Sequence, residues 1–395
     1  MSVDVKCMRH SFSTINFSIL CLLLLFNEAS FSRQIRNKYF WTLNDVTYLY
    51  PLPEHAHRIF LRSIENHVSN EILNDLPRLS VRHEKEVLNK MIYAVAIRID
   101  PEFNQIRVVW QPITNGPQNK ITTLDMALHS FYQLSTHEFR NLLQEIISWK
   151  QKYSIDTNSS SPLNIHPAFY QKSEKENSQV IIDLNELFFK YCRYDNTIKV
   201  TAMVLRGAND MWAFMGFDID RLSQKRSPIV IPRTASSTAQ RFVNQAVPAL
   251  FFENAIISPL AFNYQEDSLE NFVQKAIQMP QLTEDEVLKY LNISNRFENP
   301  HLHNTNSLDC VSCHIAQPAR EWIFRNIHQN LTSRQDMAFI YQNAHHNLTN
   351  LSAEILNTSQ IRGLGYFGRN IAISQRVIHE SAEAADYLNY QNAKH

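Results

Sequence analysis

Four apolar stretches in the first half of the chain have the composition of paired β-strands. "IYAVAIRID" and "QIRVVWQPI" flank a short polar connection at 101–104, and "TIKVTAMVLR" and "MWAFMGFDI" flank a second at 207–210. Runs rich in β-branched and aromatic residues, joined by short turn-forming segments, are typical of antiparallel hairpins. The apolar run "QVIIDL" at 179–184 predicts a further strand of the same sheet.

Helical spacing of apolar residues occurs between the two hairpins. The stretches "TLDMALHSFYQL" (123–134) and "THEFRNLLQEIISWK" (136–150) both show it, and Thr136 is the predicted N-cap of the second. Predicted strands and helices are segregated along the chain instead of alternating, which indicates the α+β class. We therefore expect an N-terminal α+β domain that contains antiparallel hairpins.

The pattern becomes helical towards the C-terminus. Thr283 and Glu286 form a predicted capping box, and helices are also predicted after Pro318 (318–331), at 333–346 and at 373–389. A polar, Asn- and His-rich stretch around 295–309 separates this part from the sheet. The expected domains are therefore residues 33–295, of unassigned role, and a mostly helical domain at 296–395, with the boundary near Asn295.

The first 32 residues have the pattern of a secretory signal peptide. Lys6 and Arg9 precede an apolar run at 15–26, and a stretch of small residues ends at Ser32. The apolar run is shorter than the roughly 20 residues that a bilayer core requires. We expect cleavage near Ser32, a periplasmic or secreted protein, and no stable membrane span in the mature chain.

Composition narrows the functional classes. Lys plus Arg and Asp plus Glu both number 38, so no overall positive field favours nucleic acid as a partner. The six glycines form no phosphate-binding or dinucleotide-binding fingerprint, and no G-x-S-x-G occurs. After signal removal three cysteines remain, too few for a disulfide scaffold: Cys192, Cys310 and Cys313.

Cys310, Cys313 and His314 spell C-x-x-C-H. This spacing allows three kinds of site: covalent haem attachment, an oxidised cysteine pair, or half of a zinc site. In haem attachment, two thiols form thioethers with the vinyl groups and the adjacent histidine reaches the iron. A zinc site would need two further ligands, for which histidines in two nearby polar stretches are available: His301, His303, His345 and His346.

The motif, in a chain with an export signal, resembles the exported c-type cytochromes of bacteria. The resemblance covers the C-terminal hundred residues. It implies one covalent haem c per chain on Cys310 and Cys313, His314 as the proximal iron ligand, and electron transfer with a redox partner protein. A polar loop precedes this motif where the small cytochromes have a helix, so a divergent haem domain is expected.

The sixth iron ligand and the exact activity stay open at this level. Met337 is the methionine that follows the motif, and it is our first candidate as a sixth ligand, ahead of the four histidines named above. An electron carrier needs no catalytic residue, and none is assigned. The alternatives are a haem enzyme or sensor with an open iron site, and an exported binding protein whose cysteines form a disulfide or zinc site.

Overall fold

The computed structural model describes residues 40–53, 61–75, 91–116, 120–169, 174–206, 211–234, 236–243, 256–257, 283–326, 334–352, 361 and 363–393. The predicted signal peptide lies outside these ranges and stays a prediction. None of the helices in the described ranges is long and apolar enough to cross a membrane.

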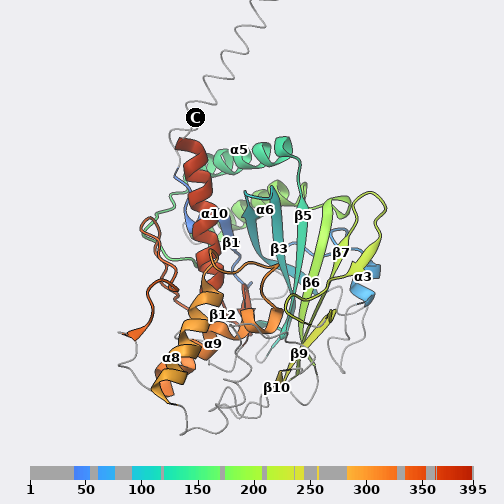
Figure 1. Cartoon of the computed structure of the whole chain (residues 1–395). Coiled ribbons are helices and arrows are strands. Elements are labelled where there is room, and N and C mark those ends of the chain that lie inside the picture. The colour runs from blue at the N-terminus through green and yellow to red at the C-terminus, as the bar shows by residue number, and fades with distance from the viewer. Residues whose placement is uncertain are drawn as a thin grey trace, which may run out of the picture.

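An antiparallel sheet is the centre of the fold (Figure 1). The strands described for it are β1 (Thr47–Leu49), β2 (Ile92–Asp100), β3 (Gln105–Asn115), β4 (Ile121–Thr123), β5 (Met126–Gln133), β6 (Thr197–Arg206), β7 (Met211–Ile219), β8 (Arg226–Pro228), β9 (Ala239–Val243) and β10 (Ile256–Ile257). The main order is β1-β2-β3-β5-β6-β7-β9-β10, with β4 paired to β3 and β8 to β7. Both predicted hairpins, β2–β3 and β6–β7, are confirmed.

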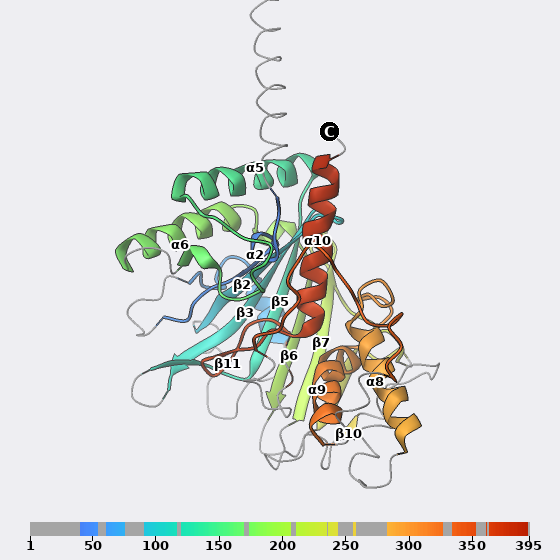
Figure 2. The same ribbon diagram turned by 90° about the vertical axis from the view of Figure 1, so that its left-hand side faces the viewer.

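The described helices are α2 (Leu43–Val46), α3 (Asn70–Asp75), α5 (Thr136–Tyr153), α6 (Glu174–Phe189), α8 (Glu284–Glu298), α9 (Cys310–Asn326) and α10 (Gln375–Ala393). A two-stranded hairpin, β11 (Tyr366–Phe367) with β12 (Asn370–Ile371), lies between α9 and α10 in the sequence. Helices α5 and α6 cover one face of the sheet. Helices α9 and α10 cover the other, with α8 packed against them (Figure 2). These layers confirm the α+β class.

Both faces of the central strands are buried, but their chemistry differs. On the face towards α6, Trp110 packs against Phe189, and its indole N–H donates to Ser130 at 2.7 Å. Side chains alternate between the faces along a strand, so Arg98, Arg107 and their neighbours point the opposite way, towards α9 and α10. The sheet therefore carries charged residues on the face that the C-terminal helices cover.

A buried carboxylate joins the sheet to its C-terminal cover. Glu380 of α10 accepts from Arg98 of β2 and, at 2.8 Å, from Arg376 one helical turn earlier. Arg376 also donates to the carbonyls of Phe297 (2.9 Å) and His303 (2.6 Å). Burial alone would raise the pKa of Glu380, but the charges of Arg98, Arg376 and Arg107 outweigh it and hold the pKa well below its usual range.

Two predicted elements were assigned the wrong type. Residues 123–134 were predicted as a helix, and most of them form β5, between β3 and β6. A strand buried on both faces lacks the apolar–polar alternation that identifies a half-exposed strand. The run at 179–184 was predicted as a strand but lies within α6, because short apolar runs do not distinguish a buried helix from a strand.

The helix predicted at 333–346 is also wrong for residues 334–346, which form turns and irregular segments. Side chains there bond the backbone in place of a helix. Asp336 accepts from the N–H of Ala338 at 3.0 Å, and Asn343 accepts from those of His345 (2.8 Å) and His346 (3.0 Å). Such bonds compete with helix formation.

The remaining predicted helix ends, and the predicted domain boundary, can be compared with the structure. Ser135 caps α5 instead of Thr136, whereas the capping box of Thr283 and Glu286 is confirmed. The helix at 373–389 is confirmed as α10. The predicted boundary residue Asn295 lies buried within α8, and residues from both sides of it share one hydrophobic core. The division into two domains stays a prediction that limited proteolysis can test.

We expect Glu380→Gln to lower the free energy of unfolding at neutral pH by about 3 kcal/mol, since losing one partner leaves the buried arginines uncompensated. Because the pKa of Glu380 is lower folded than unfolded, its contribution is present above the unfolded-state pKa of roughly 4.3. It is lost as the pH falls towards the folded-state pKa. Denaturant unfolding at several pH values measures the difference.

Glu71→Gln is the matched control for this charge. Glu71 is exposed and lies 3.7 Å from Arg226, and such surface pairs contribute at most about 1 kcal/mol. Two results would contradict the expectation: equal loss of unfolding free energy in the two variants, or a difference between Glu380→Gln and the wild type that stays the same in acid.

Candidate functional site

The C-x-x-C-H motif forms the first turn of α9. Asp309 precedes the helix, and its carboxylate accepts from the N–H of Ser312 at 2.9 Å while its carbonyl accepts from that of Cys313 at 3.2 Å. A carboxylate at this position satisfies the first backbone N–H groups and complements the helix dipole. Helix α9 therefore begins eight residues before Pro318, where the sequence predicted its start.

A residue of the sheet completes this cap. Gln240 of β9 is buried, donates to Asp309 Oδ2 at 2.8 Å and accepts from the N–H of Val311 at 2.9 Å. One side chain thus holds both the capping carboxylate and the first turn of α9. The position of the motif is set by the sheet.

The three motif side chains share one face of α9. Residues spaced by three and four positions project from the same side of a helix, so Cys310, Cys313 and His314 lie together. All three are half-buried, whereas Val311 and Ser312 between them are buried. Both cysteines are free thiols. The described motif thus presents two reduced thiols and an imidazole on one partly accessible surface.

The surroundings keep both thiols protonated. Burial, with the Asp309 charge adding to it, raises the pKa of Cys310 to about 12. Burial raises the pKa of Cys313 to about 11, with Glu380 raising it further and Arg376 and Arg107 opposing. Metal ligation and disulfide exchange both proceed through the thiolate, so these environments favour neither.

Arg107 and His129 of the sheet face the motif. The Arg107 guanidinium contacts Nδ1 of His129, and both groups interact electrostatically with motif residues, Arg107 with Cys313 and His129 with His314. Burial lowers the pKa of His129 well below its usual value, and the charge of Arg107 adds to this. His129 is therefore a neutral imidazole at physiological pH, and Arg107, whose pKa falls to about 10 mainly through burial, stays charged.

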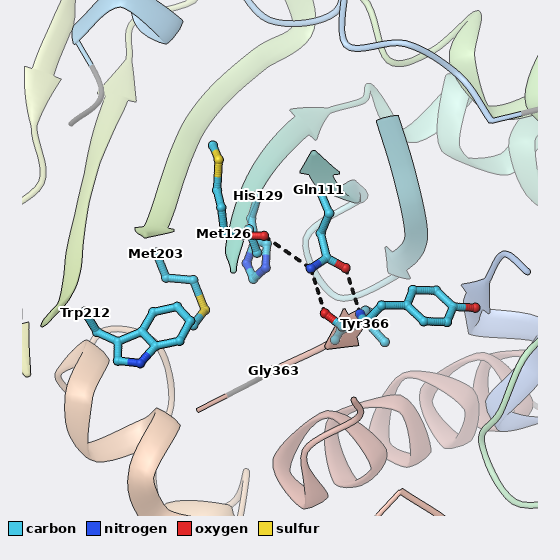
Figure 3. A pocket seen from close by; sticks show the side chains of 10 residues that line it. Gln111, Met126, His129, Met203, Trp212, Gly363 and Tyr366 are labelled. Atoms are coloured by element: carbon cyan, nitrogen blue, oxygen red, sulfur yellow. Dashed lines mark hydrogen bonds between the residues drawn. The ribbon is translucent and has the colours of Figure 1, made fainter. Parts of the chain in front are cut away.

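A small cavity lies beside His129 (Figure 3). Gly363 lines it and lies against His314, since a Cβ on Gly363 would come 3.4 Å from the imidazole Cε1. The lining residues are Gln111, Met126, Ala127, His129, Met203, Trp212 and 363–366. Its volume of about 10 Å³ is roughly that needed by one water molecule. The cavity is too small for a porphyrin.

Gln111 fixes the loop that closes this cavity. Its side-chain oxygen accepts from the N–H of Tyr366 at 2.7 Å, and its amide nitrogen donates to the carbonyls of Tyr366 (2.9 Å) and Met126 (3.2 Å). Gly365 has a φ of 138° there, and a Cβ would come 2.4 Å from the Gln111 oxygen. Only glycine fits this position.

The five residues considered as a sixth iron ligand all have surroundings different from those of the motif. Met337 lies in a turn and is 58% exposed. His345 and His346 both bond Asp386 Oδ1, at 3.0 and 3.1 Å, and His301 lies 3.0 Å from Glu383. His303 packs edge-on against Phe297. The assignment of Met337 as a ligand stays a prediction, although the helix predicted at 333–346, which contains Met337, is replaced by turns and irregular segments at 334–346.

Sequence reasoning missed the residues that the sheet contributes. Arg98 and Arg107 interrupt two apolar strands, "AIRID" and "IRVV", and a charge within a predicted core strand requires a partner. That signal was present. His129 and Gln240 gave none, because the first lay in a predicted helix and the second in no predicted element.

Among the described residues, no group of three or more His, Cys, Asp or Glu side chains is arranged to hold a metal ion. Comparison with known proteins finds no matching family model, no matching curated protein and no matching solved structure. The function is therefore argued from the motif and its surroundings.

We expect Gln240→Leu to lower the free energy of unfolding by about 2 kcal/mol. The substitution leaves the buried Asp309 carboxylate without one donor and the Val311 N–H without its acceptor. Denaturant unfolding measures the change. Gln179→Leu, at an exposed position of α6, should stay within about 0.5 kcal/mol of the wild type. A Gln240→Leu protein as stable as this control would show that the Gln240 contacts with the cap of α9 do not contribute to the free energy of unfolding.

Alkylation kinetics test the thiol environment. Cys313, with a pKa of about 11 against an ordinary 9.0, should react with iodoacetamide about a hundredfold more slowly at pH 8 than an exposed cysteine, and Cys310 more slowly still. Unfolding in denaturant should restore the ordinary rate. Rapid labelling of the folded, haem-free protein with a midpoint below pH 8.5 would instead indicate an activated redox pair.

Proposed function

We propose that this protein is an exported c-type haem protein that carries one covalent haem on Cys310 and Cys313 and transfers electrons. The observation that carries the proposal is the arrangement of two reduced thiols and His314 on one half-buried face of α9. Bound haem would supply one-electron redox chemistry at its iron.

The donor set fits this group. Each thioether forms by adding S–H across a vinyl C=C bond, with the sulfur bonding carbon and the hydrogen going to the other carbon, so no oxidant is consumed. Protonated thiols at 310 and 313 hold the required hydrogen, and His314 provides an imidazole on the same side of the helix. The half-buried motif face is the proposed attachment surface, since the cavity beside His129 has only about 10 Å³.

Two observations support haem over a zinc or disulfide site. The raised thiol pKa values oppose thiolate chemistry, and no metal-binding group of three side chains occurs in the described ranges. The proposal includes export, on the basis of residues 1–32, and a redox partner protein whose identity the chain does not indicate. His314 is the proposed proximal ligand, and Met337 the proposed sixth ligand.

The proposal is tested by asking whether the haem is covalently attached to the polypeptide. In protein produced with the haem-attachment machinery, the chromophore should stay with the polypeptide through acid-acetone extraction, in a ratio of one per chain. The double substitution of Cys310 and Cys313 by Ala should release all of it, because no thioether can form. Cys192→Ala is the matched control, since Cys192 is a buried thiol on the other side of the sheet, near His67, and should leave attachment intact.

Extraction of the colour from the wild type, or its retention in the double variant, would refute the attachment. Carbon monoxide binding by the reduced protein would show an exchangeable sixth position and favour the enzyme or sensor alternative. A sulfur-to-iron charge-transfer band that vanishes in Met337→Ala would identify the sixth ligand.

A further inference from the structure

Arg107 lies on the face of the sheet that is turned towards the motif, next to a second arginine. It is directly across from Arg98 in the β2–β3 register, and like charges in that relation are destabilising. Arg98 is neutralised by Glu380. The guanidinium of Arg107 instead packs over the Phe131 ring, with its central carbon 5.1 Å from the ring centroid, and contacts His129.

No carboxylate among the described residues pairs with Arg107. Three arginines face this region, from β2 (Arg98), β3 (Arg107) and α10 (Arg376), together with Glu380 and Asp100, and Asp309 acts on the neighbouring Cys313. Glu380 pairs with both Arg98 and Arg376, and Asp100 lies 4.0 Å from Arg98. In the described part of the chain, Arg107 forms no ion pair.

One hydrogen-bond donor of Arg107 is also unused. Its Nε is buried and has no hydrogen-bond partner. Its side-chain partner His129 is a neutral imidazole and does not neutralise the charge. A half-buried guanidinium without an anion is unfavourable, and its planar donors match a carboxylate.

We propose that Arg107 binds a carboxylate of the haem attached at Cys310 and Cys313. The proposal rests on the proposed function and names the residue of the sheet that holds the group. Haem carries two propionates, and Arg107 is close enough to Cys313 for the two groups to interact electrostatically. A carboxylate there would pair with the guanidinium of Arg107 and satisfy its unused Nε donor.

The opposite face of the sheet offers a matched control. Arg62 donates through Nε to His67 at 3.2 Å and lies 5.8 Å from the Phe189 ring centroid, so it too combines an arginine, a histidine and an aromatic ring. His67 stacks on Trp110, which projects away from Arg107. Arg62→Gln removes the same charge without altering the motif side.

The experiment compares the reduction potentials of the haem-loaded wild type, Arg107→Gln, Arg107→Lys and Arg62→Gln across a pH series. Arg107→Gln should lower the potential, because a nearby cation favours the reduced iron. It should also shift the propionate titration seen in the potential to higher pH, because the carboxylate loses its cation. Arg107→Lys should retain most of the wild-type potential, and Arg62→Gln should match the wild type.

The outcomes separate the two proposals. A wild type without covalent haem overturns both. A loaded Arg107→Gln protein whose potential and pH profile match those of Arg62→Gln overturns the role of Arg107 alone. An Arg107 effect that varies with phosphate concentration would mean that a free anion, and not the propionate, occupies the site. If Arg107→Gln does not fold, the propionate titration of the wild type decides: a pKa well below that of an ordinary carboxylic acid supports the proposal, and an ordinary one overturns it.

Discussion

The carboxylate of Glu380 is the contact on which the covered face of the sheet depends. It accepts from Arg98 of the sheet and from Arg376 of its own helix, where three arginines would otherwise repel one another. Through Arg376 the same contact reaches the end of α8 and the loop that leads to the motif. Helices can cover this polar face of the sheet only because the Glu380 charge compensates most of the positive charge of the arginines.

The motif helix depends on the sheet in a second way. Gln240 and Asp309 hold the start of α9 against β9, so the orientation of the C-x-x-C-H turn follows from residues far away in sequence. In the expected arrangement the helical segment would form a haem domain by itself. In the structure, strands contribute part of the surroundings of the motif, with Arg107 and His129 as charged and polar neighbours, and α10 contributes Arg376 and Glu380.

Local patterns predicted the α+β class, both hairpins, the capping box at Thr283 and the helix that became α10, because each depends on neighbouring residues. The motif itself was also visible. The failures have long-range causes: β5 is recognised only by its pairing with β3 and β6, and turns around Asp336 and Asn343 displaced a predicted helix. Gln240 could not be linked to Asp309 from sequence, since nothing local to either residue indicates the other.

The cap of α9 has a consequence for the order of assembly. A chain that emerges N-terminus first releases β9 before the motif and α10 after it. Gln240 is then available as soon as the motif appears, whereas Glu380 and Arg376 arrive last. Between these two moments the thiols lie on a helix that Gln240 already holds against the sheet but that α10 does not yet cover. If haem is attached as proposed, this interval is when Cys310 and Cys313 would be most accessible to an attachment enzyme, and the timing of α10 docking would limit the period available for attachment.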